Sequence, residues 1–225
     1  MKYIKLHSPA QHRHKWLVIM RKLTLIAVCV FLASIVSFQV RCVGIRTQVL
    51  RLHVIANSDS AIDQSVKIAV RDALLEEGAD LFGGSISRDE AEASILPRKE
   101  YLENCARRVL RSYGLQYDVR IAIGAEYFNT RVYDTITLPA GHYEAVRVVL
   151  GDGAGRNWWC VMFPPLCLPA ATSKAASLDA VLRAGELRVV KSNPKYEIRF
   201  KIVELAESFF AWLHGENPKT AQSDL

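Results

Sequence analysis

Residues 50–63 read LRLHVIANSDSAID, and within them the pattern changes from that of a strand to that of a helix start. From residue 50 to residue 57 the side chains alternate between an apolar face and a more polar face, as in a half-buried strand. Ser60 and Asp63 then form a capping box, in which each side chain bonds a free amide of a new helix. The stretch therefore predicts a strand that leads directly into a helix.

The chain after this stretch shows helical periods first and strand periods later. Helices are predicted at about residues 60–81, 88–95 and 98–113, and strands at about residues 117–123, 132–138, 143–150 and 158–161. The turn Pro139-Ala140-Gly141 predicts a hairpin between two of these strands. An apolar stripe predicts a closing helix at about residues 196–214. This order predicts an α+β fold with helices packed on one face of a mostly antiparallel sheet.

A basic arm and an apolar run precede this domain. Residues 1–22 contain six of the 29 Lys and Arg residues and none of the 23 acids, which accounts for the net charge of +6. The run Leu23–Val40 has no charge and would be about 27 Å long as a helix, close to the thickness of a bilayer core. Basic residues before such a run orient it in a membrane with the arm in the cytoplasm. A phosphate-binding surface would instead be basic on the folded domain, so nucleic-acid binding is not expected.

The sequence predicts one folded domain, exported behind a membrane segment. Cleavage of that segment is left open, because the run is long for a signal peptide and no small-x-small site follows it. The expected organisation is a basic cytoplasmic arm (1–22), a signal or membrane-anchor helix (23–40), a linker (41–48), a single exported α+β domain (49–214) and a polar tail (215–225).

The five cysteines leave two readings open. Cys160 and Cys167 can form a disulfide if the domain lies outside the cytoplasm, or they can be two buried free thiols. A cysteine hydrolase of the cell envelope is the alternative function, with Cys160 or Cys167 as nucleophile and His53 or His142 as base. Neither cysteine lies in a known local catalytic signature, so this alternative is the weaker one.

Other motifs carry no catalytic or metal chemistry. Gly151, Gly153 and Gly155 have the wrong spacing for a dinucleotide loop, and a strand pattern follows them where a helix is required. The polar run from Asn57 to Asp63 lacks the glycine and late glutamate of a calcium loop, so turn formation and capping explain it better. We therefore expect no metal and no cofactor.

The aromatic residues near the turns are the best candidates for binding a partner. Trp158 and Trp159 are neighbours on a predicted strand and must point to opposite faces, so that one can fill the core while the other is exposed. An exposed tryptophan is a frequent binding hot spot. The tentative contact surface comprises Trp158, Trp159, Phe163, His53, Asn57 and Asp59.

Several segments resemble one known family. LRLHVIANSDS (50–60), Asp63-Gln64, VRDALL (70–75), TLPAGHYEAVRVVLGDGAGRNWWCVMFPPLC (137–167) and YEIRFKIVEL (196–205) are similar to the stage II sporulation protein R family. The resemblance covers about residues 50–212, and the stretch NWWC-x-x-FPPLC is its most specific part. The basic arm is longer than the family pattern suggests.

The resemblance implies a role in signalling and no catalysis. It implies a protein made in the forespore and exported across the forespore inner membrane into the space between the two cells, with anchoring through residues 23–40 left open. There it would activate a membrane-bound aspartic peptidase of the mother cell, which removes the pro-sequence of sporulation sigma factor E. That peptidase is the expected partner.

Overall fold

The computed structural model describes residues 9–81, 87–133, 136–166 and 177–191. The chain divides into two compact units, residues 1–41 and residues 42–225.

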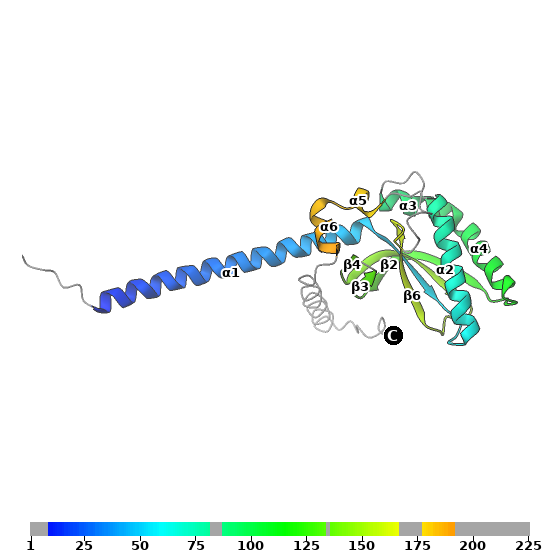
Figure 1. Cartoon of the computed structure of the whole chain (residues 1–225), viewed down its shortest axis with the longest axis horizontal. Coiled ribbons are helices and arrows are strands. Elements are labelled where there is room, and N and C mark those ends of the chain that lie inside the picture. Colours follow the sequence, from blue (N-terminus) through cyan, green and yellow to red (C-terminus); the bar gives the residue numbers. More distant parts are fainter. Residues whose placement is uncertain (1–8, 82–86, 134–135, 167–176, 192–225) are drawn as a thin grey trace, which may run out of the picture. The chain divides into compact units, whose positions relative to one another are not determined.

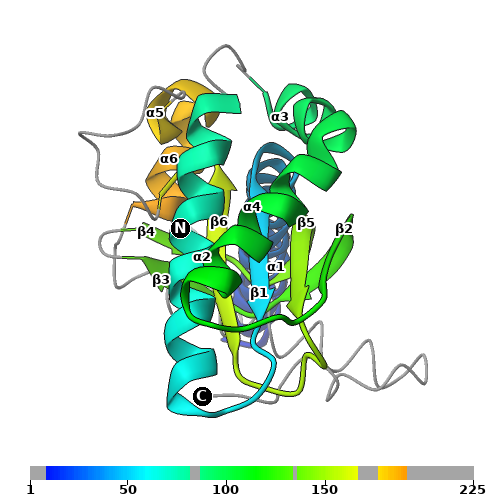
Figure 2. The same ribbon diagram turned by 90° about the vertical axis from the view of Figure 1, so that its right-hand side faces the viewer.

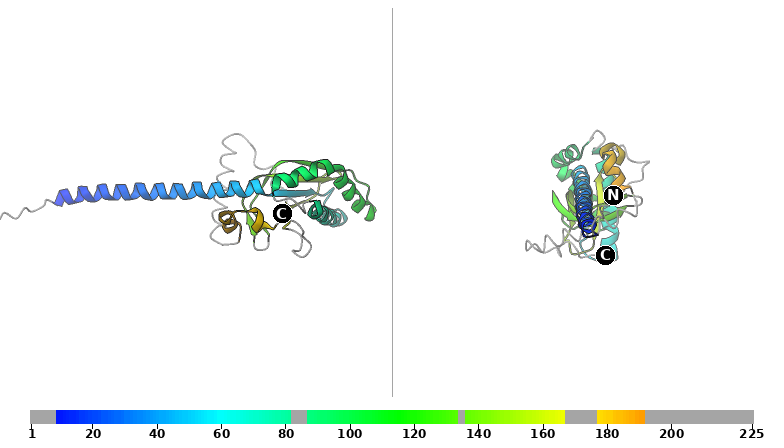
Figure 3. Two further views of the ribbon diagram at one scale, coloured as in Figure 1. Left: turned by 90° about the horizontal axis from the view of Figure 1, so that it is seen from above. Right: turned by 90° about the vertical axis from the view of Figure 1, so that its left-hand side faces the viewer.

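The first unit consists of most of helix α1, which spans Pro9–Gln48 in full (Figures 1 and 3). Its apolar residues between Trp16 and Val36 are exposed, and the helix is long and apolar enough to cross a membrane. The helical region predicted at residues 23–40 is thus confirmed. It is longer than expected, because no proline or glycine interrupts the chain between Pro9 and Val43.

Residues 41–48 are helical, whereas we expected a linker. They form the last turns of α1, and residues 42–48 belong to the second unit, where Cys42 and Ile45 are fully buried. Gln48 Nε2 donates a hydrogen bond of 3.1 Å to Glu186 Oε2. We expected a linker because the stretch contains several polar residues. Its few apolar residues lie at helical spacing, and this apolar stripe packs into the domain.

A four-stranded mixed sheet, in the order β2-β5-β1-β6, is the centre of the second unit (Figure 2). Its strands are β1 (Leu50–Ile55), β2 (Val119–Phe128), β5 (Gly141–Leu150) and β6 (Asn157–Phe163). The pairs β2–β5 and β1–β6 are antiparallel, and β1–β5 is parallel. The predicted α+β class is confirmed, with one parallel pair inside a mostly antiparallel sheet.

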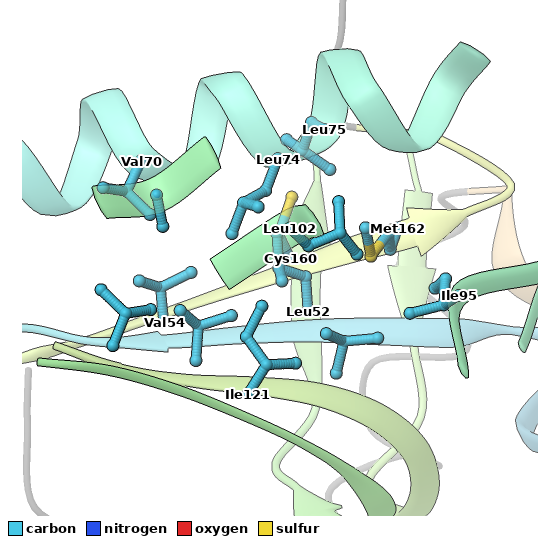
Figure 4. Close-up of a cluster of buried hydrophobic side chains, with 14 of the residues drawn as sticks. Leu52, Val54, Val70, Leu74, Leu75, Ile95, Leu102, Ile121, Cys160 and Met162 are labelled. Atoms are coloured by element: carbon cyan, nitrogen blue, oxygen red, sulfur yellow. The ribbon is translucent and has the colours of Figure 1, made fainter. Parts of the chain in front are cut away.

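Helices cover one face of this sheet (Figures 1 and 2). They are α2 (Ala61–Leu81), α3 (Arg88–Ile95), the 3-10 turn η1 (Leu96–Arg98) and α4 (Lys99–Ser112). Between helices and sheet lies a core of buried aliphatic side chains, among them Leu52, Val54, Leu74 and Ile121 (Figure 4). These residues lie at period two in the strands and at helical spacing in α2 and α4, so sequence periodicity identifies them.

The predicted hairpin through Pro139-Ala140-Gly141 is wrong. The segment expected as one strand at 132–138 forms a separate two-stranded sheet, β3 (Arg131–Tyr133) with β4 (Ile136–Leu138). Strand β5 after the turn pairs instead with β2 and β1. A turn sequence shows where the chain bends but not which strand lies beside it.

Two short helices, α5 (Leu178–Val181) and α6 (Ala184–Val190), follow the sheet and were not expected. The closing helix predicted at residues 196–214 and the polar tail at 215–225 lie outside the described residues.

Candidate functional site

The face of the sheet opposite the helices carries a cluster of polar and aromatic side chains. Leu50, Leu52 and Val54 face the helices, so Arg51 and His53, which alternate with them, face the other side. We call the residues gathered there the polar–aromatic cluster: Arg51, His53, Glu126, Phe128, Tyr133, Tyr143, Asn157 and Trp159.

The sheet curves around this cluster. Strands β2 and β6 are the two outer strands, yet the rings of Phe128 and Trp159 are 4.8 Å apart between centroids. Arg51 on β1 lies 4.2 Å from the Phe128 ring centroid, although β5 separates their strands. The end of β2 therefore bends over β1 and β6, and the second face becomes concave.

His53 is held on all sides within the cluster. Its Nδ1 lies 2.8 Å from Glu126 Oε1, and its Nε2 lies 2.7 Å from Asn157 Oδ1. Its ring stacks on Trp159 at 3.6 Å and 15°. The residue is only 4% exposed, and both ring nitrogens already have partners. His53 therefore orients Trp159 and Glu126, and it can act as a base only after Asn157 is displaced.

Arg51 is completely buried and has no carboxylate among its contacts in the described part of the chain. Its Nε donates to the Cys160 carbonyl at 2.9 Å, and its Nη2 donates to the Tyr133 hydroxyl at 2.5 Å. The rings of Phe128, Tyr133 and Tyr143 lie within 6 Å of the guanidinium, which favours the cation. Burial lowers the pKa of Arg51 from its ordinary value.

Asn57 and Asp59 belong to a second group, formed by the turn after β1 and the glycine-rich turn after β5. The Asn57 Oδ1 accepts a hydrogen bond of 3.0 Å from the Asp152 amide, and the Asp59 Oδ1 accepts one of 2.8 Å from the Arg156 amide. Gly151 and Gly153 have positive φ, which this tight turn requires. A Cβ on Gly155 would meet the Ser58 carbonyl, so the close approach of the two turns requires glycine there. Gly151, Gly153 and Gly155 thus serve turn geometry, in agreement with the sequence.

Asp63 closes the same turn, and only half of the predicted capping box is present. Its amide donates to Ser60 Oγ at 3.2 Å, but its carboxylate bonds Ser58 and Asn57 and not the Ser60 amide. Burial alone would raise the pKa of the Asp63 carboxyl. Hydrogen bonds from Ser58, Asn57, Tyr117 and Ser60 outweigh this and hold the pKa below its ordinary value.

The remaining sequence candidates are separated by the sheet. Trp158 and Trp159 point to opposite faces, as predicted, but both are half-buried. Trp158 packs against the hydrophobic core beneath the Arg71 guanidinium, 4.4 Å from its ring centroid. Phe163 is fully buried in the core, so a partner of the folded domain cannot contact it.

The sheet also keeps Cys160 and His53 apart, so they cannot form the nucleophile and base of a cysteine hydrolase. Cys160 lies opposite Leu52 and faces the helices, whereas His53 lies opposite Trp159 and faces the cluster. A base must come within about 3 Å of the thiol, which these two residues cannot do across a sheet. Cys167 lies outside the described residues, so its pairing with Cys160 stays a prediction.

Sequence reasoning missed Arg51, Glu126 and Asn157. Arg51 and His53 alternate with aliphatic residues on a central strand, and two polar residues at that spacing were a signal of a polar interior on the second face. Glu126 and Asn157 gave no such signal, because only the curvature of the sheet brings Glu126 to His53 and only the pairing of β1 with β6 brings Asn157 there. The described residues contain no group of three or more His, Cys, Asp or Glu that could hold a metal ion.

Comparisons with known proteins agree on one family. A family model described as stage II sporulation protein R matches residues 46–173. A curated relative named "Stage II sporulation protein R", from Bacillus subtilis (strain 168), is 37% identical over 125 residues. That match covers 56% of this chain and 56% of the relative, so it spans about half the length of each. No solved structure matches the chain.

Proposed function

The chain belongs to the stage II sporulation protein R family and so has a role in sporulation, and from this premise we propose that it is an exported signal that activates a membrane-bound peptidase. The peptidase is the aspartic enzyme of the mother cell that removes the pro-sequence of sporulation sigma factor E. The signal crosses the forespore inner membrane and meets the peptidase in the space between the two cells.

The membrane-length helix α1 ahead of a folded unit supports export. The family match begins at residue 46, after the apolar part of α1. An alkaline phosphatase fused after Gln48 should be active outside the cytoplasm. The topology is refuted if this fusion is inactive while a cytoplasmic reporter at the same position works.

The Trp159 side of the domain is the proposed contact surface. Trp159 is half-buried and is held rigidly between His53 and Phe128. The Arg131 guanidinium lies 5.9 Å from the centroid of its ring. We call Arg131 and Trp159 the Trp159 patch. Val132 is 59% exposed, but as the neighbour of Arg131 on β3 it points to the opposite side and is not part of the patch. A tryptophan fixed before binding loses little entropy when a partner docks, which suits a hot spot.

The test is precursor cleavage in a non-sporulating host that expresses the signal, the peptidase and the sigma factor precursor. Trp159→Ala and Arg131→Ala should each reduce cleavage strongly, since loss of a hot spot costs about 2 kcal/mol or more, or about thirtyfold in affinity. Trp158→Ala is the matched control, because it removes the same side chain on the opposite face. It should reduce cleavage only in proportion to the loss of folded protein.

Arg131→Ala keeps the test independent of the core, because Arg131 is half-buried at the Trp159 ring and is not one of the core residues. Val132→Asp is a second control, because its exposed side chain points away from Trp159, and it should keep cleavage at the wild-type level. If Arg131→Ala and Trp159→Ala both trigger cleavage at the wild-type level, this surface is wrong. If the wild-type protein triggers no cleavage when all three proteins are present, the peptidase-activation proposal itself is wrong.

A further inference from the structure

The outer edge of strand β2 is covered by helix α4 along its first half, and no described element covers it at residues 123–126. It pairs on one side with β5 in a regular register without a bulge, and it forms the edge of the four-stranded sheet (Figure 2). Such an edge offers unpaired amides and carbonyls to any other strand, so folded proteins usually shield it with charges, prolines, bulges or covering elements.

Helix α4 shields the first half of this edge. The Glu103 carboxylate accepts a hydrogen bond of 3.0 Å from the Ile121 amide, and Arg107 Nη2 donates one of 3.1 Å to the Val119 carbonyl. These two contacts show that the odd-numbered residues of β2 direct their backbone groups outward. Glu103 and Arg107 also line an open depression of about 490 Å³ at the start of α4, which adjoins this part of the edge.

At residues 123–126 no helix or strand of the described part of the chain covers the edge. Ile123 and Ala125 direct their backbone groups to the same side as Ile121, and in the described part of the chain no strand or side chain bonds them there. Gly124 and Ala125 are exposed, and a Cβ on Gly124 would meet nothing within 4 Å. No lysine or proline occurs from residue 123 to 126, and Glu126 is turned inward to His53.

The charge beside the open edge indicates the kind of strand that fits it. Arg147 on β5 is exposed on the concave side of the sheet and lies opposite Ala122 of β2, whose small side chain does not separate it from the edge. Arg120 of β2 is exposed on the same side, but its guanidinium donates to the Gly151 carbonyl, away from residues 123–126. In a strand added at residues 123–126, the side chain nearest Ala122 on this face would lie beside Arg147, where a carboxylate is favourable.

We propose that residues 123–126 of β2 accept an extended, acidic segment of a partner protein as a fifth strand of the sheet. Backbone hydrogen bonds to Ile123 and Ala125 supply the affinity, and an acidic side chain next to Arg147 supplies the specificity. A second copy of this chain fits less well, because it would add its own Arg120 and Arg147 to the same continuous face. The inference goes beyond the proposed function, since it concerns a surface distinct from the Trp159 patch.

The test measures binding of a fluorescein-labelled peptide to the full-length chain in detergent micelles by fluorescence anisotropy. The probe is a short peptide in which Glu and Val alternate, and the control peptide has Lys in place of Glu. We expect the Glu–Val peptide to bind at least about tenfold more tightly than the Lys–Val peptide. Arg147→Glu, a change of an exposed side chain, should abolish or reverse that preference.

Ala125→Pro tests the backbone contribution. The Ala125 amide faces outward, so proline removes no hydrogen bond to β5 and is tolerated at such an edge position. This variant should bind the Glu–Val peptide at least about tenfold more weakly, whereas Ala125→Ser, which keeps the amide, should stay within about twofold. Equal binding of the two peptides, or wild-type binding by both Ala125→Pro and Arg147→Glu, overturns the proposal.

The oligomeric state distinguishes a partner's strand from a second copy of this chain at the edge. If light scattering shows a wild-type dimer that Ala125→Pro dissociates, the edge joins two copies and the heterologous strand is refuted. Because the assay contains no peptidase, its result does not depend on the function proposed above.

Discussion

Replacement of Arg51 should show an unusual order, in which methionine is tolerated better than lysine. Arg51 is completely buried, and its guanidinium reaches two acceptors at once, the Cys160 carbonyl and the Tyr133 hydroxyl. Lysine keeps the charge but has one terminal nitrogen and no planar group to lie against the three aromatic rings. Methionine removes the charge and fills the same space with a flexible apolar chain.

The magnitudes follow from what each variant leaves behind. Arg51→Lys leaves a buried ammonium with incomplete hydrogen bonding, which costs about 3–5 kcal/mol. Arg51→Met leaves the Cys160 carbonyl without its side-chain donor, which costs about 1–3 kcal/mol. The Tyr133 hydroxyl keeps a contact of 3.3 Å to the Trp159 carbonyl, so its loss is small. For a domain of this size, about 1 kcal/mol corresponds to about 2–4 °C in Tm.

The assay is thermal unfolding of the full-length chain in mild detergent, followed by near-UV circular dichroism. We expect Arg51→Lys to unfold about 5 °C or more below Arg51→Met, and both below the wild type. Burial lowers the pKa of a lysine in the folded state below its ordinary value of about 10.4, so the unfolded state binds more protons between those two values. Stability of the lysine variant should therefore rise with pH in that window, and the wild type should not show this rise.

Two outcomes would refute the reasoning about Arg51. One is a lysine variant as stable as the wild type, which would mean that the charge alone holds the cluster. The other is a methionine variant less stable than the lysine variant, which would mean that the charge contributes more than its burial costs.

Three further predictions concern the turns and the junction with α1. Asp63→Asn should cost about 1–2 kcal/mol at neutral pH, because the carboxylate accepts bonds from Ser58 and Asn57. The pKa of Asp63 is lowered in the folded state, so this stabilisation is present above the unfolded value of about 3.9 and is lost as pH falls through the folded value. In urea unfolding, the difference in free energy of unfolding between variant and wild type should therefore be smaller at pH 3 than at pH 7. Gly155→Ala should lower the free energy of unfolding more than Gly114→Ala in the same assay, because a Cβ at Gly155 meets the Ser58 carbonyl. Gly114, at φ +75, has free space around a Cβ, so its substitution costs only about 1–2 kcal/mol in backbone strain. Equal losses would contradict the close approach of the two turns. Gly44→Ala should push the Glu186 carboxylate away from Gln48 and make the end of α1 more accessible to limited proteolysis, whereas Thr47→Ala, on the same helix, should not.

The sequence predicted most elements because their signals are local. The strand at 50–55 and the helix after it follow from alternation, a Ser60 cap and helical spacing, and each needs only neighbouring residues. The strand pairing was missed because it is not local. The turn at residues 139–141 was recognised, but β5 after it pairs with β1 and β2 and not with β4 before it. Both partners are separated from the turn by other elements of the chain.

The candidate site divides in the same way. His53 and Trp159 could be selected from the sequence, since a histidine on an apolar strand and a tryptophan pair are unusual features. Their stacking could not be predicted, because it depends on the antiparallel register of β1 and β6. The register also places Cys160 on the opposite face from His53, which no spacing in the sequence reveals.

By itself, the sequence determined the membrane-length apolar segment, the α+β class and the residues that fill the core, because these depend on composition and period. Only the tertiary structure decided that residues 42–48 belong to the folded domain, that Glu126 and Asn157 hold His53, and that no other described strand pairs with the outer edge of β2 at residues 123–126. Each of these depends on the curvature of the sheet or on contacts between residues far apart in the chain, and that information is not carried by any local pattern.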